Sequence, residues 1–370
     1  MKQSKVAILR TKPETVIKDY RELMNLAGYQ KEFAKTKETI LKLNLSWSLY
    51  YPACSTEPWQ LHGVLDAMDK DGFDFKQLHA VENETVVTNV WKGAKGNKWL
   101  DILKQYNLKY EPLTETKWIK YKPKAEMLAL DNVFKPCGSK SHEETAYSLP
   151  EMFIGKNIIH FPTLKTHGHT QLTGAMKNAF GGLITTKRHH CHKKIHEVLV
   201  DLLQIQKEIH PGMFAVMDGT VAGDGAGPRT MHPKIKNVIL ASPDQVAIDA
   251  VAAHMMGYDP LKIPFIKIAH DKGLGMGDID QIDFAGISKN QFKAINYHFE
   301  TNKSPVIFWD QMLRKKLKFI EPLLFHTPLF KMCVFGSAFY HDYVWYNLIG
   351  RLRINKFMKT DWGKLWKTYK

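Results

Sequence analysis

The amino-acid sequence predicts an α/β fold, with a mostly parallel sheet flanked by helices and a basic, aromatic C-terminal extension. Short apolar runs alternate with segments of helical periodicity, and Gly, Pro and polar residues separate them. Charge and aromatic content then change from Gln311 onward. Repeated strand–helix alternation builds parallel sheets, whose functional side chains lie in loops at the carboxyl ends of the strands.

Two strand–helix units are predicted in the first part of the chain. The expected strands are 6–9 and 39–45, and the expected helices are 19–26 and 59–68. The helix at 59–68 has apolar residues at helical spacing, whereas the loop before it, 46–58, is rich in Trp, Tyr and Pro.

The same alternation continues further along the chain. The expected strands are 157–162, 213–219 and 236–242, the expected helices are 196–209 and 243–256, and segment 125–130 is ambiguous. A polar stretch at 138–144 places a boundary near residue 150. We therefore expect an N-terminal α/β lobe (1–150), a second α/β lobe (151–300) and the extension (301–370).

The chain is strongly basic, with a formal net charge of +15. From Gln311 to the end there are twelve Lys or Arg and three Asp or Glu, so this segment carries more than half of the excess. Basic proteins prefer polyanions, anionic lipids or acidic metabolites. The predicted partner is a small anionic metabolite, with an anionic membrane surface and a homodimer as alternatives; no nucleic acid is expected.

The four cysteines, Cys54, Cys137, Cys191 and Cys333, are widely separated in the sequence. An iron–sulfur cluster needs several closely spaced thiolates, so we expect none within this chain. The N-terminus lacks the apolar stretch of a signal peptide, and charged residues and prolines interrupt 319–350 before it could span a bilayer. These features predict a cytoplasmic protein, with attachment to a membrane surface as an alternative.

The first cluster of candidate site residues lies between Pro162 and Gly182. Its members are Lys165, His167, His169, Lys177 and Asn178. Lysine and histidine here would hold a carboxylate or phosphate and exchange protons near neutral pH. A helix start expected at Thr173 would add free N–H groups for an anion. A solvated basic loop is an equally weighted interpretation.

A second cluster is rich in histidine. It contains His189, His190, Cys191, His192 and His196. Imidazole and thiolate bind zinc, copper or nickel, so a transition-metal site through His189, His190 and His192 is one interpretation. A solvated basic loop is favoured over a structural metal site, and a single catalytic histidine here is a separate expectation.

The third cluster is a glycine-rich segment after the predicted strand at 213–219. Its candidate residues are Asp218, Gly219, Gly223, Asp224, Gly225, Gly227 and Arg229. Glycines let the backbone approach a ligand closely, and successive N–H groups can bind an anion. The spacing matches neither a dinucleotide-binding fingerprint nor a P-loop. A functional loop is favoured over a flexible surface loop because Asp218 lies at a strand end.

The extension combines aromatic and basic side chains. Its aromatic part includes Phe335, Phe339, Tyr343 and Trp345, and its end carries Arg351, Arg353, Lys356, Trp362 and Trp366. Such a composition suits a membrane interface. Packing of the aromatic residues onto the main body, or onto a second subunit, is weighted equally.

Several of these segments together resemble a known family. They are Lys-Leu-Asn-Leu at 42–45, Leu-Lys-Thr-His at 164–167, Thr-Gly-Ala-Met-Lys-Asn-Ala-Phe-Gly at 173–181, Val-Met-Asp-Gly at 216–219, Gly-Asp-Gly-Ala-Gly-Pro at 223–228 and Leu-Ala-Ser-Pro-Asp-Gln-Val-Ala-Ile-Asp at 240–249. Their order over about 38–275 resembles the domain of unknown function 362 family. Many members of that family carry a ferredoxin-like cysteine module, which this sequence lacks.

The sequence is more distantly similar to lactate-racemase-like proteins. In those proteins a histidine precedes a cofactor-bearing lysine by ten residues, and another histidine follows; here His167, Lys177 and His192 have comparable spacing. The resemblance implies proton transfer by His167, an anchoring role for Lys177 and a metal-side histidine among His189, His190 and His192. The racemase glycine run is replaced by Thr173-Gly-Ala-Met, so the resemblance implies the pocket and not the nickel-pincer cofactor.

The favoured function is an enzyme, racemase-like or an oxidoreductase, with histidine and lysine proton transfer on a small anionic metabolite. Its catalytic candidates are His167, Lys177, Lys165, Asn178 and Asp218, which we expect to line one cleft. The anion would be held by Lys165, Lys177 and segment 223–229. The alternative is a non-catalytic protein that docks onto a membrane or a redox partner through its extension.

Overall fold

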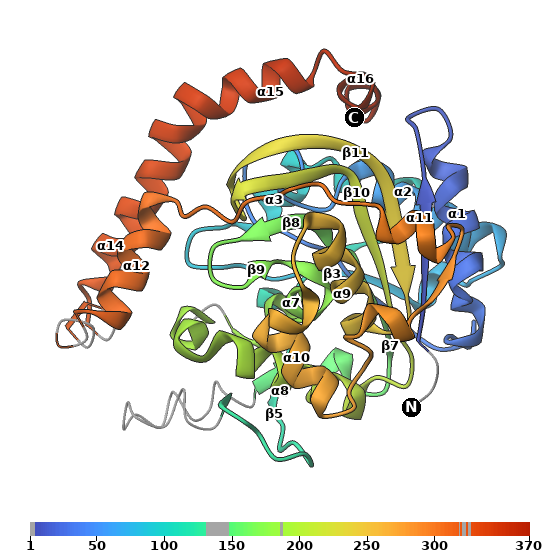
Figure 1. The fold of residues 1–370 in the computed structure, drawn as a ribbon, viewed down its shortest axis with the longest axis horizontal. Helices are drawn as coiled ribbons and strands as arrows, with labels where there is room; N and C mark the ends of the chain where they lie inside the picture. Colours follow the sequence, from blue (N-terminus) through green and yellow to red (C-terminus); the bar gives the residue numbers. More distant parts are fainter. Residues whose placement is uncertain (1–3, 131–147, 186–187, 318, 320–322, 325–326) are drawn as a thin grey trace.

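The computed structural model describes residues 4–130, 148–185, 188–317, 319, 323–324 and 327–370. Within these residues, a ten-stranded mixed sheet carries helices on both faces (Figure 1). The main path of the sheet runs β12-β1-β11-β10-β7-β2-β3-β4, and β8 and β9 continue from β10. The α/β prediction is confirmed.

The central part of the sheet is parallel. Strand β10 pairs with β7, β7 with β2, β2 with β3 and β3 with β4, all in parallel. The strands are β2 (Thr39–Lys42), β3 (Leu78–Glu82), β4 (Tyr110–Pro112), β7 (Asn157–His160) and β8 (Thr163–His167). Because β2 and β3 belong to the predicted first lobe and β7 and β10 to the second, strands from both sides of residue 150 share one sheet.

The other half of the sheet is mostly antiparallel. Strand β11 (Thr230–Ser242) pairs antiparallel with both β10 (Met213–Ala226) and β1 (Lys5–Arg10). At the edge, β12 (Asp283–Ala285) lies parallel to β1. A short strand, β9 (Gln171–Leu172), folds back onto β8. A separate two-stranded sheet joins β5 (Trp118–Lys120) and β6 (Ser148–Pro150).

Residues on alternate sides of each strand enter two different cores. Ile40 packs against helices on one face, whereas its neighbour Leu41 packs against helices on the other. The first face is covered by α7 (Gly174–Leu183), α8 (Ile195–Ile209), α9 (Gln245–Met256) and α10 (Pro264–Asp271). The second face is covered by α1 (Val16–Ala27), α2 (Pro58–Lys70), α3 (Val90–Gly96) and α4 (Trp99–Gln105). The helices predicted at 19–26, 59–68, 196–209 and 243–256 are confirmed.

The glycine-rich segment after the predicted strand at 213–219 is strand for most of its length, and not a loop. Strand β10 extends to Ala226, where Gly223 pairs with Pro233 and Gly225 with Met231. A Cβ on Gly223 would lie 2.4 Å from the sulfur of Met231 and 2.9 Å from Cβ of Lys165. The glycines are therefore needed for close contact between strands, a role that a sequence pattern cannot separate from ligand binding.

The extension forms a helical arm along one side of the molecule (Figure 1). Helix α12 (Pro305–Lys315) precedes three contiguous helical segments: α14 (Phe330–Ala338), the π-helical η9 (Phe339–Gly350) and α15 (Arg351–Phe357). We call 330–357 the C-terminal arm. Helix α16 (Asp361–Thr368) then returns to the body, where Trp362 enters the second core. Among the described helices, none is both long and apolar enough to cross a bilayer.

Candidate functional site

A cavity of about 290 Å³ lies where β2, β3 and β8 end and where α7 begins its packing against them. Its position follows the rule that sites in parallel sheets form beyond the carboxyl ends of the strands. Helix α12 and the arm close the far side with Asp310 and His341. The charged and imidazole groups of the lining are Lys42, Glu82, His167, His169, Lys177, Arg188, His192, Arg229, Asp310 and His341.

Lys42 and Glu82 form a buried ion pair at the floor of the cavity. The Lys42 Nζ donates to Oε1 of Glu82 at 2.6 Å and to the carbonyl oxygen of Leu43 at 2.7 Å. Burial lowers the pKa of Lys42, and Glu82 opposes that shift by stabilising the charged amine. Asn178 is fixed beside this pair because its side-chain amide donates to the carbonyl oxygen of Lys42 at 2.9 Å.

Lys165 lies behind the cavity wall. Its Nζ donates to Oδ1 of Asn44 at 2.8 Å, to Oγ of Ser46 at 3.1 Å and to the carbonyl oxygen of Cys54. Burial lowers the pKa of Lys165 to about 8. Because Asn44 and Ser46 line the cavity while Lys165 does not, this lysine positions the wall.

Lys177 faces the cavity from α7 without a partner of opposite charge. Its amine makes no ion pair or hydrogen bond with any residue that the structure describes, and it lies 5.6 Å from the ring centroid of Phe180. Burial, followed by repulsion from Lys165 and Arg188, lowers the pKa of Lys177 to about 7. At neutral pH this group therefore exists as both ammonium and free amine, which suits proton transfer.

Two arginines complete the positive wall. Arg188 donates to the carbonyl oxygens of Phe180 and Glu84, which leaves its Nε buried without a hydrogen-bond partner among the described residues. Arg229 donates from Nε to the carbonyl oxygen of Ser46 at 3.0 Å. Backbone oxygens therefore orient both guanidinium groups, and no carboxylate of the described chain pairs with them.

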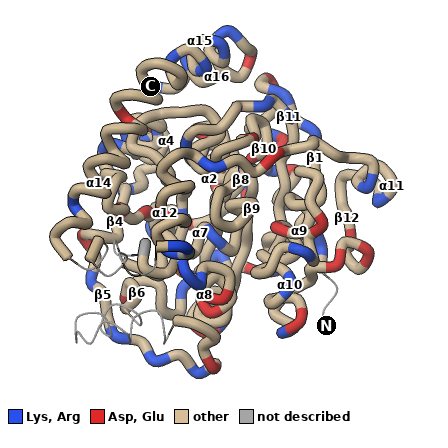
Figure 2. Tube along the Cα trace, turned by 60° about the vertical axis from the view of Figure 1, so that its left-hand side comes forward, with Lys and Arg blue, Asp and Glu red and all other residues tan. Residues whose placement is uncertain are grey.

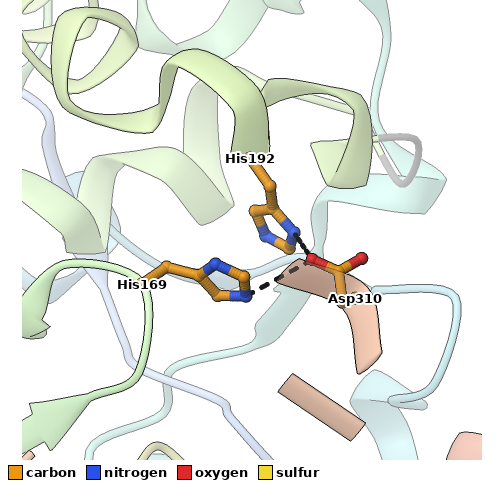
Figure 3. A group of neighbouring side chains, drawn as sticks. All are labelled: His169, His192 and Asp310. Atoms are coloured by element: carbon orange, nitrogen blue, oxygen red, sulfur yellow. Dashed lines mark ion pairs between the residues drawn. The ribbon is translucent and has the colours of Figure 1, made fainter. Parts of the chain in front are cut away.

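Three histidines lie on the wall nearest α12. The Nδ1 of His167 accepts a hydrogen bond from the backbone N–H of His169 at 3.2 Å, so the neutral ring carries its proton on Nε2. The rings of His169 and His192 stack with centroids 4.4 Å apart, and both approach Asp310 (Figure 3). Burial lowers the pKa of all three histidines.

Asp218 is not part of the cavity lining. Its carboxylate accepts hydrogen bonds from Tyr20, from Nε1 of Trp59 at 3.0 Å and from Thr220 at 2.8 Å, all in the core. Burial raises the pKa of Asp218, and these donors oppose the shift. Of the five residues expected to line one cleft, the structure brings His167, Lys177 and Asn178 to the cavity and places Lys165 just behind its wall.

The glycine-rich segment meets the cavity only at its far end. Gly227 and Arg229 line it, whereas Gly219, Gly223, Asp224 and Gly225 lie along β10 outside the lining. The carbonyl oxygens of Gly223 and Gly225 accept from the hydroxyl of Thr166. These glycines join β10 to β8 and do not surround the cavity.

The start of α7 does not offer free N–H groups to an anion. Thr173 is the N-cap residue as predicted, but Asp249 of α9 occupies the helix end. The backbone N–H groups of Ala175 and Met176 donate to its two carboxylate oxygens at 2.6 and 3.0 Å. The expectation of an anion site here is therefore wrong, because a carboxylate of the chain itself takes that position.

Of the predicted metal-binding histidines, only His192 lines the cavity. His190 belongs to the same helical turn, η6 (Arg188–Lys194), and the side chain of His189 lies outside the described part of the structure. Sequence reasoning missed Lys42, Glu82, Arg188 and Asp310. Lys42 and Glu82 end the neighbouring parallel strands β2 and β3, and this position at the strand ends could have indicated them. Asp310, in contrast, has no local motif that connects it with the histidines.

Comparison with known proteins identifies a family match over the segment that contains most of the cavity lining. Residues 39–254 match the family described as Domain of unknown function (DUF362). The chain belongs to this family. Most of the cavity lining lies within the matched segment, while Asp310 and His341 lie beyond it. The similarity to lactate racemases stays a prediction.

One relative is the Thylakoid-associated protein of Synechocystis sp. It is 30% identical over 121 residues, which are 32% of this chain and 37% of the relative. The chain thus matches little more than a third of the length of that relative. No solved structure matches.

Proposed function

We propose that this protein is an enzyme that binds a small carboxylate or phosphorylated metabolite in the cavity and transfers a proton on it. One observation supports this function: Lys177, Arg188 and Arg229 border the same 290 Å³ space, and the described chain supplies no carboxylate that pairs with them. Such cations are stable when a ligand brings the missing negative charge.

Each group has a distinct role in this proposal. The guanidinium groups of Arg188 and Arg229 bind the anion and orient it. Lys177 accepts or donates the proton, because its pKa of about 7 makes both forms available. The Nε2 proton of His167 is a second donor toward the cavity. Lys165 and Asn178 position the wall and the floor.

Binding of simple anions to the full-length protein tests this function. The probes are lactate, succinate and inorganic phosphate, measured by isothermal titration calorimetry. We expect Lys177→Gln and Arg229→Gln to weaken binding of the best probe at least about tenfold, since each removes a charge-assisted contact. The matched control is Lys272→Gln, an exposed lysine remote from the cavity lining, which should change binding less than twofold. Equal affinities in all three variants would contradict the proposal.

A second function, peripheral attachment to an anionic membrane surface, is favoured by the outer face of the C-terminal arm. Phe335 and Leu352 are each 70% exposed, and Phe339, Tyr343 and Leu348 are exposed between them. The rings of Phe335, Phe339 and Tyr343 stack in series along the helix. Exposed aromatic and aliphatic side chains in one continuous row mark an interaction surface.

The opposite face of the arm already packs on the body. Trp345 and His341 are buried, and Nε1 of Trp47 donates to Asp342 at 2.6 Å. Exposed cations accompany the apolar row, at Lys331, Arg351, Lys356 and Lys359, and Figure 2 shows basic residues along α15 and α16. Apolar side chains flanked by cations fit an anionic lipid surface. The relative named as thylakoid-associated supports this proposal.

Vesicle co-sedimentation tests the membrane proposal. Truncation at Pro305 is unsuitable because it removes Phe357 and Trp362 from the second core. Instead, Phe335→Ser with Phe339→Ser should reduce binding to phosphatidylglycerol vesicles at least about tenfold, because two rings that would enter the lipid are lost. The control Ile235→Ser, an exposed apolar side chain on β11, should bind as the unchanged protein does. A homodimer that covers the arm and ignores lipid would contradict the proposal.

A further inference from the structure

His169, His192 and Asp310 bring two imidazoles and one carboxylate together on the cavity wall (Figure 3). Nε2 of His169 lies 3.7 Å from Oδ2 of Asp310, and Nδ1 of His192 lies 3.8 Å from the same oxygen. The three ligand atoms all lie within 4.8 Å of one another. Among the described residues, two imidazole nitrogens and one carboxylate oxygen are thus close enough to approach a single ion.

Three separate segments supply these side chains. His169 follows β8, His192 lies in η6 and Asp310 lies in α12, as the ribbons of Figure 3 show. The first two belong to the segment that matches the family, whereas Asp310 lies beyond residue 254. The extension of this chain therefore supplies the carboxylate to two histidines of the α/β body.

The distances are too long for direct hydrogen bonds. An N–H···O bond has a donor–acceptor distance of about 2.7–3.2 Å, which neither histidine reaches with Asp310. Nδ1 of His192 is buried and has no hydrogen-bond partner among the described residues. A buried nitrogen without a partner is unfavourable, so a further group is expected between the rings and the carboxylate.

Asp310 is itself held in place by Arg314, one helical turn further along α12. Nε of Arg314 donates to both carboxylate oxygens, at 3.0 and 3.1 Å. A ligating carboxylate that is fixed by a neighbouring donor is common around metal ions. The same contact also allows a different interpretation, in which Asp310 serves only as the ion-pair partner of Arg314. Substitution of Arg314 distinguishes these two roles.

We propose that His169, His192 and Asp310 bind a divalent first-row transition metal ion. Two imidazole nitrogens and one carboxylate oxygen are a donor set of zinc and non-haem iron sites, and three protein ligands leave coordination positions open to the cavity. Bonds of about 2.0–2.1 Å place tetrahedral ligand atoms about 3.3 Å apart. The imidazole nitrogens, now 3.7 and 3.8 Å from Oδ2 of Asp310, therefore have to move closer to that oxygen when the ion binds. An anion in the cavity would lie beside the ion, but metal binding itself does not depend on the proposed enzyme function.

The test uses full-length protein stripped with a chelator, with Zn²⁺ and Co²⁺ alone as probes. We expect one equivalent of Zn²⁺ by calorimetry, visible absorption bands on addition of Co²⁺, and a higher Tm with metal. Asp310→Asn and His192→Asn should each weaken binding at least tenfold. The control His298→Asn changes an exposed histidine outside the cluster and should leave affinity within twofold.

Arg314→Gln distinguishes a metal ligand from a structural ion pair. It breaks the same ion pair as Asp310→Asn but keeps the ligating carboxylate, so metal affinity should fall clearly less than in Asp310→Asn, because only an orienting donor is lost and a nearby positive charge is removed. Equal loss of metal binding in Arg314→Gln and Asp310→Asn would overturn the proposal. So would absence of binding in the unchanged protein, or one equivalent of metal retained by Asp310→Asn.

Discussion

The cavity and the outer face of the C-terminal arm place opposite kinds of side chain in unusual surroundings. In and directly behind the cavity wall, lysines and arginines are buried or nearly so, at Lys42, Lys165 and Arg188. On the arm, aromatic and aliphatic side chains such as Phe335 and Leu352 face solvent. Both arrangements cost free energy unless another group compensates.

Compensation is partial around the cavity and absent on the outer face of the arm. Lys42 has Glu82, and Lys165 has three oxygen acceptors, whereas Lys177 has no such partner and its pKa falls to about 7. On the arm, the apolar row has no covering segment among the described residues. The comparison teaches that lysines with partners inside the chain, such as Lys42 with Glu82, have a structural role. The unpaired Lys177 and the exposed apolar row of the arm are instead suited to partners from outside the chain.

The largest expected effect comes from the end of the arm that is covered. Trp362 is 2% exposed, packs on Trp59 with ring centroids 5.0 Å apart and donates from Nε1 to Asn237 at 2.7 Å. Trp362→Ala should lower the free energy of unfolding by about 3–5 kcal/mol, because it leaves a cavity and an unpaired amide oxygen. Urea denaturation of the unchanged protein and the variant measures this difference in the free energy of unfolding.

The control for this change is a tryptophan of the same extension that faces solvent. Trp309 is 58% exposed, so Trp309→Ala should change the free energy of unfolding by less than about 0.5 kcal/mol. Similar values for the two tryptophans would show that α16 does not anchor the extension to the second core.

A somewhat smaller effect is expected when a completed pair in the cavity is broken. Glu82→Gln leaves the Lys42 amine buried without its carboxylate, which should cost about 3 kcal/mol of stability at pH 7. Lys42→Met combined with Glu82→Gln removes the uncompensated charge and should recover part of that loss. Thermal unfolding of Glu82→Gln, Lys42→Met and the double variant measures this, and additive losses in the double variant would argue against a coupled pair.

The sequence predicted the architecture well because local patterns carry it. Apolar runs such as 39–45 and the helical spacing of 59–68 report on burial within one element, and β2 and α2 lie there. The expectation that His167, Lys177 and Asn178 gather at strand ends also follows from a general rule of parallel sheets.

The same reasoning failed where distant segments meet. Asp218 was expected in the cavity because it ends a predicted strand, yet β10 continues for eight more residues and Asp218 turns into the core. Asp249 occupies the start of α7, and Asp310 approaches the histidines, from segments whose position no local pattern indicates. Gly219 and Gly223 serve close packing between strands. A glycine-rich sequence alone does not distinguish this role from that of an anion-binding loop.

The pH dependence of anion binding tests whether Lys177 is the unpaired charge. Lysine binds an anion as ammonium, and the pKa of Lys177 in the free protein is about 7, so affinity for succinate should fall as pH rises from 6 to 8. The protonated fraction drops about tenfold over this range, which bounds the expected change. Burial lowers the pKa of His167, His169 and His192, so the lysines are the main candidates for this titration, and burial lowers the pKa of Lys165 to about 8.

Lys177→Gln should flatten the profile between pH 6 and 7.5, where Lys165 remains protonated. Succinate is the probe because it is mostly dianionic from pH 6 upward, whereas inorganic phosphate changes its own charge near pH 7. A profile that rises with pH, or one unchanged in Lys177→Gln, would assign the titration to another group.

The smallest effect separates charge from apolar contact on the arm. Lys356 is exposed on α15, and one basic residue near an anionic surface contributes about 1 kcal/mol, so Lys356→Gln should weaken binding to phosphatidylglycerol vesicles about fivefold at low salt. At about 1 M salt the screening length shortens to about 3 Å, and this difference should vanish. The loss caused by Phe335→Ser should persist there, because burial of an aromatic ring does not depend on screening. Lys272→Gln, remote from the arm, is the control at both salt concentrations. If salt abolished the effects of Phe335→Ser and Lys356→Gln equally, the apolar row would not enter the lipid, and attraction by the basic residues alone would account for binding.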